Sequence, residues 1–118
     1  MINSQVVIYH NPRCSKSRAT LQILQEHGIQ PKIIEYLKTP PNGEEINKLL
    51  DMLNISPRNL LRKGEDVYKL LDLKNKNISD TNIVSAMVDN PILIERPIVV
   101  INGKAKIGRP PEQGLDLF

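Results

Sequence analysis

The sequence predicts an α/β fold built on a four-stranded mixed sheet. Three observations carry this prediction: a strand–helix–strand order at the start of the chain, a helical block in the middle, and a strand hairpin near the end. The 118 residues are enough for one domain with a single core. No repeat, low-complexity tract or linker interrupts them, so we expect residues 1–118 to form a single domain.

The beginning of the chain predicts two parallel strands joined by a helix. The run QVVIYH (5–10) is rich in β-branched and aromatic residues and stops at Asn11, which is typical of a buried strand. A helix is expected from Ser15 to about His27, and PKIIEYL (31–37) is expected to form the second strand. So short a connection implies a parallel pair with a right-handed crossover.

The middle of the chain, at about 42–90, is predicted to be helical. Asn42 suits a helix N-cap and Glu45 suits its capping-box partner. Residues 56–64 suggest a short helix, and Ser79 is expected to open the last one. Apolar residues after Asn42 recur at the spacing of one helix face, namely Ile46, Leu49, Leu50 and Leu53.

The end of the chain returns to strands. PIVVI (97–101) and KAKIG (104–108) flank Asn102-Gly103, a strong hairpin signal, and a brief helix is expected around Glu112 to Leu117. Without the helical block the order is βαβ followed by ββα, which is the layout of a thioredoxin-like core with helices on both faces of the sheet. The block at about 42–90 is then an insertion before the third strand.

Composition and charge narrow the classes of function. A net charge of +3 and a pI near 9.1 suit a nucleic-acid surface, a membrane surface or an anionic small molecule. The chain has no dense lysine run and no interleaved basic and aromatic stretch, so we expect no nucleic acid. No apolar run approaches the ~20 residues that span a bilayer, so we expect no membrane partner. One cysteine and no recognisable signal peptide favour a cytoplasmic protein.

The single cysteine, Cys14, is the candidate nucleophile. It falls where the first predicted helix begins, and unpaired N–H groups and the helix dipole stabilise negative charge there. Such a setting can lower a thiol pKa from ~8.5 to between about 3.5 and 7.5, and the same N–H groups can hold an anion. The alternative is a small buried residue with incidental charged neighbours. Those neighbours are His10, Arg13, Lys16 and Arg18.

The motif CSKS excludes an internal disulfide. Ser17 stands where a C-x-x-C motif would have its second cysteine, so any disulfide of Cys14 must form with an outside thiol such as glutathione. His10 is either a structural histidine or a partner that keeps the thiolate charged. No histidines or carboxylates have metal-ligand spacing and no glycine-rich phosphate loop exists, so we predict no metal and no bound cofactor.

Three arginines, Arg62, Arg96 and Arg109, stand in unusual local contexts. Each alone is best explained as a solvated surface residue, yet guanidinium groups match tetrahedral oxyanions because they offer paired donors and keep their charge. Arg96-Pro97 falls at the start of a predicted strand, where a thioredoxin-like fold has a cis-proline facing the cysteine. Three further residues, Pro97, Asn11 and Ser17, are expected to shape the site structurally.

The chain resembles the glutaredoxin-coupled arsenate reductase family (ArsC-like, thioredoxin fold) along nearly its whole length. The matching segments, in order, are IYHNPRCSKSR, EYLKTPP, LLRK, NPILIERPIVV and GRPPE. With CSKS after the strand, the chain is most similar to a shorter branch of the family. The resemblance implies Cys14 as nucleophile, His10 as the residue that tunes its thiol, and Arg62, Arg96 and Arg109 as the arginines that bind the oxyanion.

The resemblance also implies a reaction and its partners. The Cys14 thiolate would attack arsenate or a related oxyanion, glutathione would act as co-substrate, and glutaredoxin would resolve the mixed disulfide. Two alternatives stay open at this point. One is a general monothiol oxidoreductase acting on glutathione mixed disulfides, and the other is a regulatory module similar to the Spx-type proteins that bind RNA polymerase.

Overall fold

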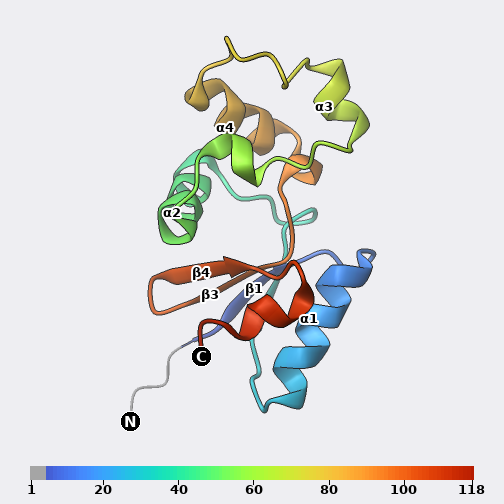
Figure 1. The fold of residues 1–118 in the computed structure, drawn as a ribbon, viewed down its shortest axis with the longest axis vertical. Coiled ribbons are helices and arrows are strands. Elements are labelled where there is room, and N and C mark those ends of the chain that lie inside the picture. Colours follow the sequence, from blue (N-terminus) through green and yellow to red (C-terminus); the bar gives the residue numbers. More distant parts are fainter. Residues whose placement is uncertain (1–4) are drawn as a thin grey trace. The chain divides into compact units, whose positions relative to one another are not determined.

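The computed structural model describes residues 5–118, and the contacts among them divide the chain into two compact units. The first unit joins the residues up to Thr39 to the segment Arg96–Phe118, and the second is Pro40–Glu95. The second unit contains the predicted helical block at about 42–90 and the first contains every strand (Figure 1). That the whole chain forms one domain stays a prediction.

The first unit is built on a four-stranded mixed sheet in the order β2-β1-β3-β4, as the sequence predicted. β1 pairs with β2 in parallel and with β3 in antiparallel, and β3 pairs antiparallel with β4. Each strand is one to three residues shorter than expected from the sequence. The strands are β1 (Val7–His10), β2 (Lys32–Glu35), β3 (Ile98–Ile101) and β4 (Lys104–Ile107).

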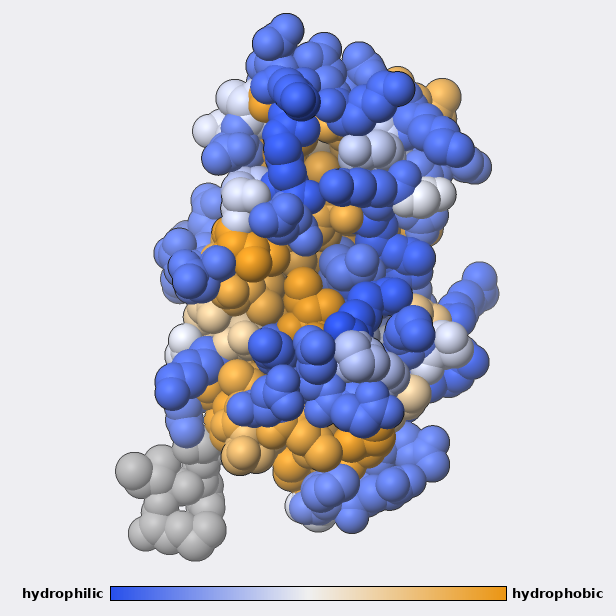
Figure 2. Space-filling view, viewed as in Figure 1, coloured by the Kyte–Doolittle hydropathy of each residue, from blue (hydrophilic) through white to orange (hydrophobic). Residues whose placement is uncertain are grey.

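Helix α1 (Ser15–Glu26) and the 3-10 helix η3 (Pro111–Leu115) pack beside each other in this unit (Figure 1). The expected C-terminal helix is therefore a 3-10 turn. The core of the unit joins β1, α1 and β3 through Val6, Ile8, Leu24 and Val99, and partly buried residues such as Leu115 pack against it. On the face drawn in Figure 2, hydrophobic residues reach the surface among hydrophilic ones.

The hairpin between β3 and β4 has the turn that its sequence predicted. Ile101 pairs with Lys104, which leaves Asn102 and Gly103 as a two-residue loop. Both have positive φ, at 53° and 74°. A type I′ turn requires positive φ at both positions, and Asn-Gly adopts that conformation more readily than other residue pairs.

The second unit holds three α-helices and two short 3-10 helices. The N-caps predicted from the sequence are present: Glu45 N donates to Asn42 Oδ1 at 2.8 Å, and Asn82 N donates to Ser79 Oγ at 3.2 Å. None of the helices within residues 5–118 has the length and apolar character needed to cross a membrane. The helices are α2 (Gly43–Leu53), η1 (Pro57–Leu60), α3 (Asp66–Leu70), α4 (Asp80–Asp89) and η2 (Pro91–Leu93).

The short helix expected over residues 56–64 is reduced to the 3-10 turn η1. The backbone becomes extended at Leu61, which forms an isolated antiparallel bridge with Ile94. Around this bridge Arg62 N donates to Leu93 O at 2.7 Å and Glu95 N donates to Leu60 O at 2.8 Å. These long-range hydrogen bonds compete with the helical ones, and no local sequence pattern predicts them.

Candidate active site

Cys14 is the N-cap residue of α1, where the sequence placed it. β1 ends at His10, and the chain turns so that Cys14 N donates to Asn11 O at 3.0 Å. Cys14 then has an extended backbone, and its carbonyl accepts the first helical hydrogen bond from Arg18 N at 3.0 Å. The thiol is free and partly exposed, and the first turn of α1 carries no acidic residue. The unpaired N–H groups of this helix terminus therefore lie next to the thiol, and such groups attract anions.

Arg109 lies beside this thiol, although 95 residues separate the two in sequence. Its Nη2 is 3.7 Å from Cys14 Sγ, and its Nε donates to the carbonyl oxygen of Arg96 at 2.8 Å. The second contact fixes the plane of the guanidinium, so that one edge is anchored to the backbone while the other faces the sulfur. A planar fork with several donors can make both contacts at once.

Arg96 and Pro97 precede β3, and the peptide bond between them is cis, as the fold analogy predicted. The Arg109–Pro110 bond is also cis, which the sequence did not predict. Arg96 is buried, with 6% of its surface exposed, and its carbonyl holds Arg109. The first unit thus brings Cys14, Arg96 and Arg109 into one connected set through the Arg109 side chain.

A buried hydrogen-bonded group joins the end of β1 to the first turn of α1. Its members are His10, Asn11 and Ser17. Asn11 N donates to Ser17 Oγ at 3.0 Å, and Ser17 Oγ lies 2.7 Å from His10 Nδ1. Burial lowers the pKa of His10 below its ordinary value of 6.5, the Glu35 carboxylate raises it, and the Arg18 guanidinium lowers it further. The net effect is a lowered pKa, so His10 is neutral at neutral pH.

Arg62 belongs to the second unit, where two carboxylates hold its side chain. Its Nη1 is 3.3 Å from Glu65 Oε1, and its Nε is 3.6 Å from Glu95 Oε1. All three side chains are about a quarter exposed. Sequence reasoning did not single out the two glutamates. The role of Arg62 in binding an oxyanion stays a prediction.

Thr20 and two glycines make a close contact that the sequence did not predict. Thr20 is fully buried in α1, and its hydroxyl donates to Lys16 O at 2.9 Å and lies 3.4 Å from Gly108 O. A Cβ added at Gly108 would lie 2.5 Å from Thr20 Oγ1, and one at Gly114 would lie 2.8 Å from Thr20 Cγ2. The absence of side chains at these glycines therefore lets α1 approach the segment that carries Arg109.

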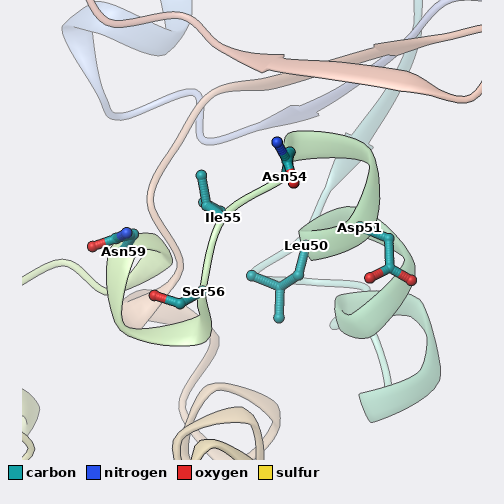
Figure 3. A pocket seen from close by; sticks show the side chains of 6 residues that line it. All are labelled: Leu50, Asp51, Asn54, Ile55, Ser56 and Asn59. Atoms are coloured by element: carbon teal, nitrogen blue, oxygen red, sulfur yellow. The ribbon is translucent and has the colours of Figure 1, made fainter.

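A pocket of about 440 Å³ in the second unit lies at the end of α2 and the loop that follows it (Figure 3). Its lining contains no cysteine, no cation and only one ionisable side chain, that of Asp51. Such a lining repels anions and supplies no nucleophile, so the pocket is not a candidate for the chemistry of Cys14. It is lined by Leu50, Asp51, Asn54, Ile55, Ser56 and Asn59.

The sheet order, the thiol at the start of the first helix and the cis-proline before β3 define a thioredoxin-like fold with a single-thiol site. Among solved structures, the chain is similar to one described as an arsenate reductase from Vibrio cholerae. The two have a TM-score of 0.95 and 50% identity, over 97% of this chain and 98% of that one.

The model of the ArsC family matches residues 9–117, and the chain belongs to this family. It is 46% identical over 109 residues to an arsenate reductase of Neisseria meningitidis serogroup A, covering 92% of this chain and 93% of that protein. It is also 53% identical over 117 residues to the uncharacterized protein YfgD of Escherichia coli (strain K12), covering 98% of both.

Proposed function

We propose that this protein is an arsenate reductase in which the Cys14 thiolate is the nucleophile. The observation that carries the proposal is the 3.7 Å contact between Arg109 Nη2 and Cys14 Sγ at the N-terminus of α1. For a thiolate to attack an anionic substrate, the nucleophile must lie beside a group that donates hydrogen bonds to the substrate oxygens. Membership of the ArsC family and the arsenate reductases among its relatives support the same substrate.

The first step joins the sulfur to arsenic. The Cys14 thiolate attacks arsenic(V), a sulfur–arsenic bond forms, and a hydroxide leaves and is protonated by solvent. The proposed role of Arg96, Arg109 and Arg62 is to offset the charge on the arsenate oxygens. Arginine suits this role because its charge persists at any physiological pH and its donors pair with two oxygens at once.

The second step transfers the electrons and needs an outside thiol, because the chain has only one cysteine. Glutathione thiolate attacks Cys14 Sγ, a disulfide forms, and the sulfur–arsenic bond breaks with its electron pair on arsenic. Arsenic(V) thereby becomes arsenic(III) and leaves as arsenite, while two thiols are oxidised. A glutaredoxin thiol then attacks the glutathione sulfur and releases the Cys14 thiolate. We place this cycle in the reducing environment of the cytoplasm.

The direct test is production of arsenite by purified protein supplied with arsenate, glutathione and glutaredoxin. We expect turnover by the wild type and none by Cys14→Ser, which keeps the shape of the side chain and loses the thiolate. Arsenite formation that does not exceed the Cys14→Ser background would overturn the proposal.

A second candidate function, reduction of protein–glutathione mixed disulfides, is favoured by the single partly exposed thiol. That reaction needs Cys14 and has no need of oxyanion-binding arginines. The variants Arg96→Gln and Arg109→Gln distinguish the two functions. Loss of arsenate reduction in these variants supports the arsenate assignment. Deglutathionylation that persists in both variants, in a protein without arsenate turnover, supports the second function.

A further inference from the structure

A second pocket lies in the first unit, beside the loop that leads from β1 to Cys14. It has a volume of about 210 Å³ and opens where β1 and β2 end. The register of the two strands pairs His10 with Glu35, and both residues line the pocket. Its lining comes from the loop just before Cys14 and from the EYLK segment after β2, and includes Asn11, Arg13, Glu35, Leu37 and Lys38.

The charges at this pocket are available to a ligand. Arg13 is exposed, and within residues 5–118 its guanidinium has no ion-pair partner. Lys38 Nζ lies 3.4 Å from Glu35 Oε1, but the two side chains are 79% and 39% exposed. An ion pair this exposed contributes little free energy. A charged group of an incoming ligand can therefore take the place of either Lys38 or Glu35 in the pair.

We propose that this pocket binds glutathione, the peptide thiol on which the proposed function depends. Glutathione has a carboxylate at each end and an ammonium group beside one of them. Arg13 and Lys38 can receive the carboxylates, Glu35 can receive the ammonium group, and the exposed Leu37 offers an apolar surface to the methylene groups. The ligand and the pocket thus have complementary charges, group for group.

The loop geometry connects the pocket to the reacting sulfur. Arg13 N donates to Asn11 Oδ1 and Cys14 N donates to Asn11 O, both at 3.0 Å. Arg18 Nη1 also donates to Pro12 O at 2.9 Å. Asn11 therefore fixes Arg13 and Cys14 together, next to each other in the chain. A tripeptide extends about 10 Å, so glutathione bound at Arg13 can bring its central thiol to Cys14.

The position of the pocket also suits the direction of the second step. In the sheet, β2 and β3 flank β1 on opposite sides, so the pocket beside β2 lies across β1 from Arg96 and Arg109. Displacement at sulfur is in line, and the attacking thiol must approach opposite the bond that breaks. Arsenate held by the arginines and glutathione held at β2 would meet Cys14 Sγ from opposite sides.

The binding test uses S-methylglutathione, which cannot form a disulfide, added to the full-length wild-type protein. We expect amide chemical-shift changes that saturate and centre on Asn11, Arg13 and residues 35–38. Saturable changes centred on Arg96 and residues 107–109 instead, or no saturable change at all, would overturn the proposed pocket. This readout does not depend on arsenate turnover, so it separates the failure of the pocket from the failure of the proposed function.

The kinetic test compares two thiols. We expect Arg13→Gln and Lys38→Gln each to raise the KM for glutathione about three- to fivefold, the effect of one exposed charge contact. The KM for arsenate and turnover driven by β-mercaptoethanol, which has no carboxylate, should not change. Lys32→Gln is the matched control, since Lys32 is exposed on β2 outside the pocket, and it should leave all three values unchanged. Equal losses with both thiols, or no loss with glutathione, would contradict the proposal.

Discussion

At the scale of single residues, Ser17 explains how His10 is oriented near the thiol. Ser17 Oγ accepts the Asn11 N–H at 3.0 Å and forms a second hydrogen bond with His10 Nδ1 at 2.7 Å. A hydroxyl can donate or accept, so this bond orients the imidazole whichever ring nitrogen carries the proton. From the sequence, His10 was either a structural histidine or a partner that keeps the thiolate charged. Burial lowers the pKa of His10, so at neutral pH it offers the thiol no full positive charge.

The lowered pKa of His10 predicts a loss of stability in mild acid. Near pH 6.5 the unfolded chain takes up a proton on this histidine, while burial lets the native state resist protonation. The free energy of unfolding should therefore fall as the pH drops from about 7.5 to about 5.5. His10→Asn keeps a hydrogen-bonding side chain next to Ser17 and removes the titration, so the unfolding free energy measured with denaturant should show a smaller fall.

The matched control for this prediction is His27→Asn, which removes the exposed histidine at the end of α1. We expect it to keep the wild-type fall in unfolding free energy. A fall of the same size in the wild type and in His10→Asn would show that His10 does not titrate differently in the native and unfolded states.

At the scale of elements, local patterns predicted what local hydrogen bonds determine. Asn42 and Ser79 cap helices, Asn102-Gly103 turns the hairpin, and Cys14 begins α1, all as their immediate neighbours indicated. The local patterns failed where contacts between residues distant in sequence determine the structure. The bridge of Leu61 with Ile94 shortens an expected helix. The residues around Gly108 also give no local signal that this glycine lies against a threonine of α1.

The contact between Gly108 and Thr20 predicts strong destabilisation by a single methyl group. A Cβ on Gly108 would lie 2.5 Å from Thr20 Oγ1 and 3.0 Å from Pro97 Cγ, so α1 or the Arg109 segment must shift. We expect Gly108→Ala to lower the free energy of unfolding by about 1–3 kcal/mol. Arsenate turnover should fall with it, since the same segment holds Arg109 beside Cys14.

A double-mutant cycle tests whether Thr20 is the cause. In Thr20→Ala the clashing atoms of Thr20 are gone and only the 3.0 Å contact with Pro97 Cγ remains, so adding Gly108→Ala should cost less there than in the wild type. Gly64→Ala is the control, because a Cβ at Gly64 would meet nothing within 4 Å, and it should change stability little. If Gly108→Ala costs the same with and without Thr20, the contact does not set the approach of α1.

At the scale of the whole molecule, the proposed oxyanion site depends on arginines far apart in the sequence. Local sequence context singled out three arginines, Arg62, Arg96 and Arg109. In the structure Arg109 contacts both Cys14 and Arg96. The ion pairs of Arg62 with Glu65 and Glu95 could not be read from the sequence, because they depend on the bridge that brings Arg62 near Glu95. These pairs also offer Arg62 a purely structural role.

Stabilisation by the anion separates the two roles of Arg62. In a Cys14→Ser protein, which binds without reacting, arsenate at about 100 times its Kd should raise the free energy of unfolding by about 2.7 kcal/mol. Arg62→Gln in that background should weaken binding about tenfold and reduce the gain by about 1.4 kcal/mol at the same arsenate concentration. Because the gain compares one variant with and without arsenate, any loss of the ion pairs with Glu65 and Glu95 cancels. Lys63→Gln removes a neighbouring exposed cation and should keep the full gain. An undiminished gain in Arg62→Gln would assign Arg62 to its ion pairs alone.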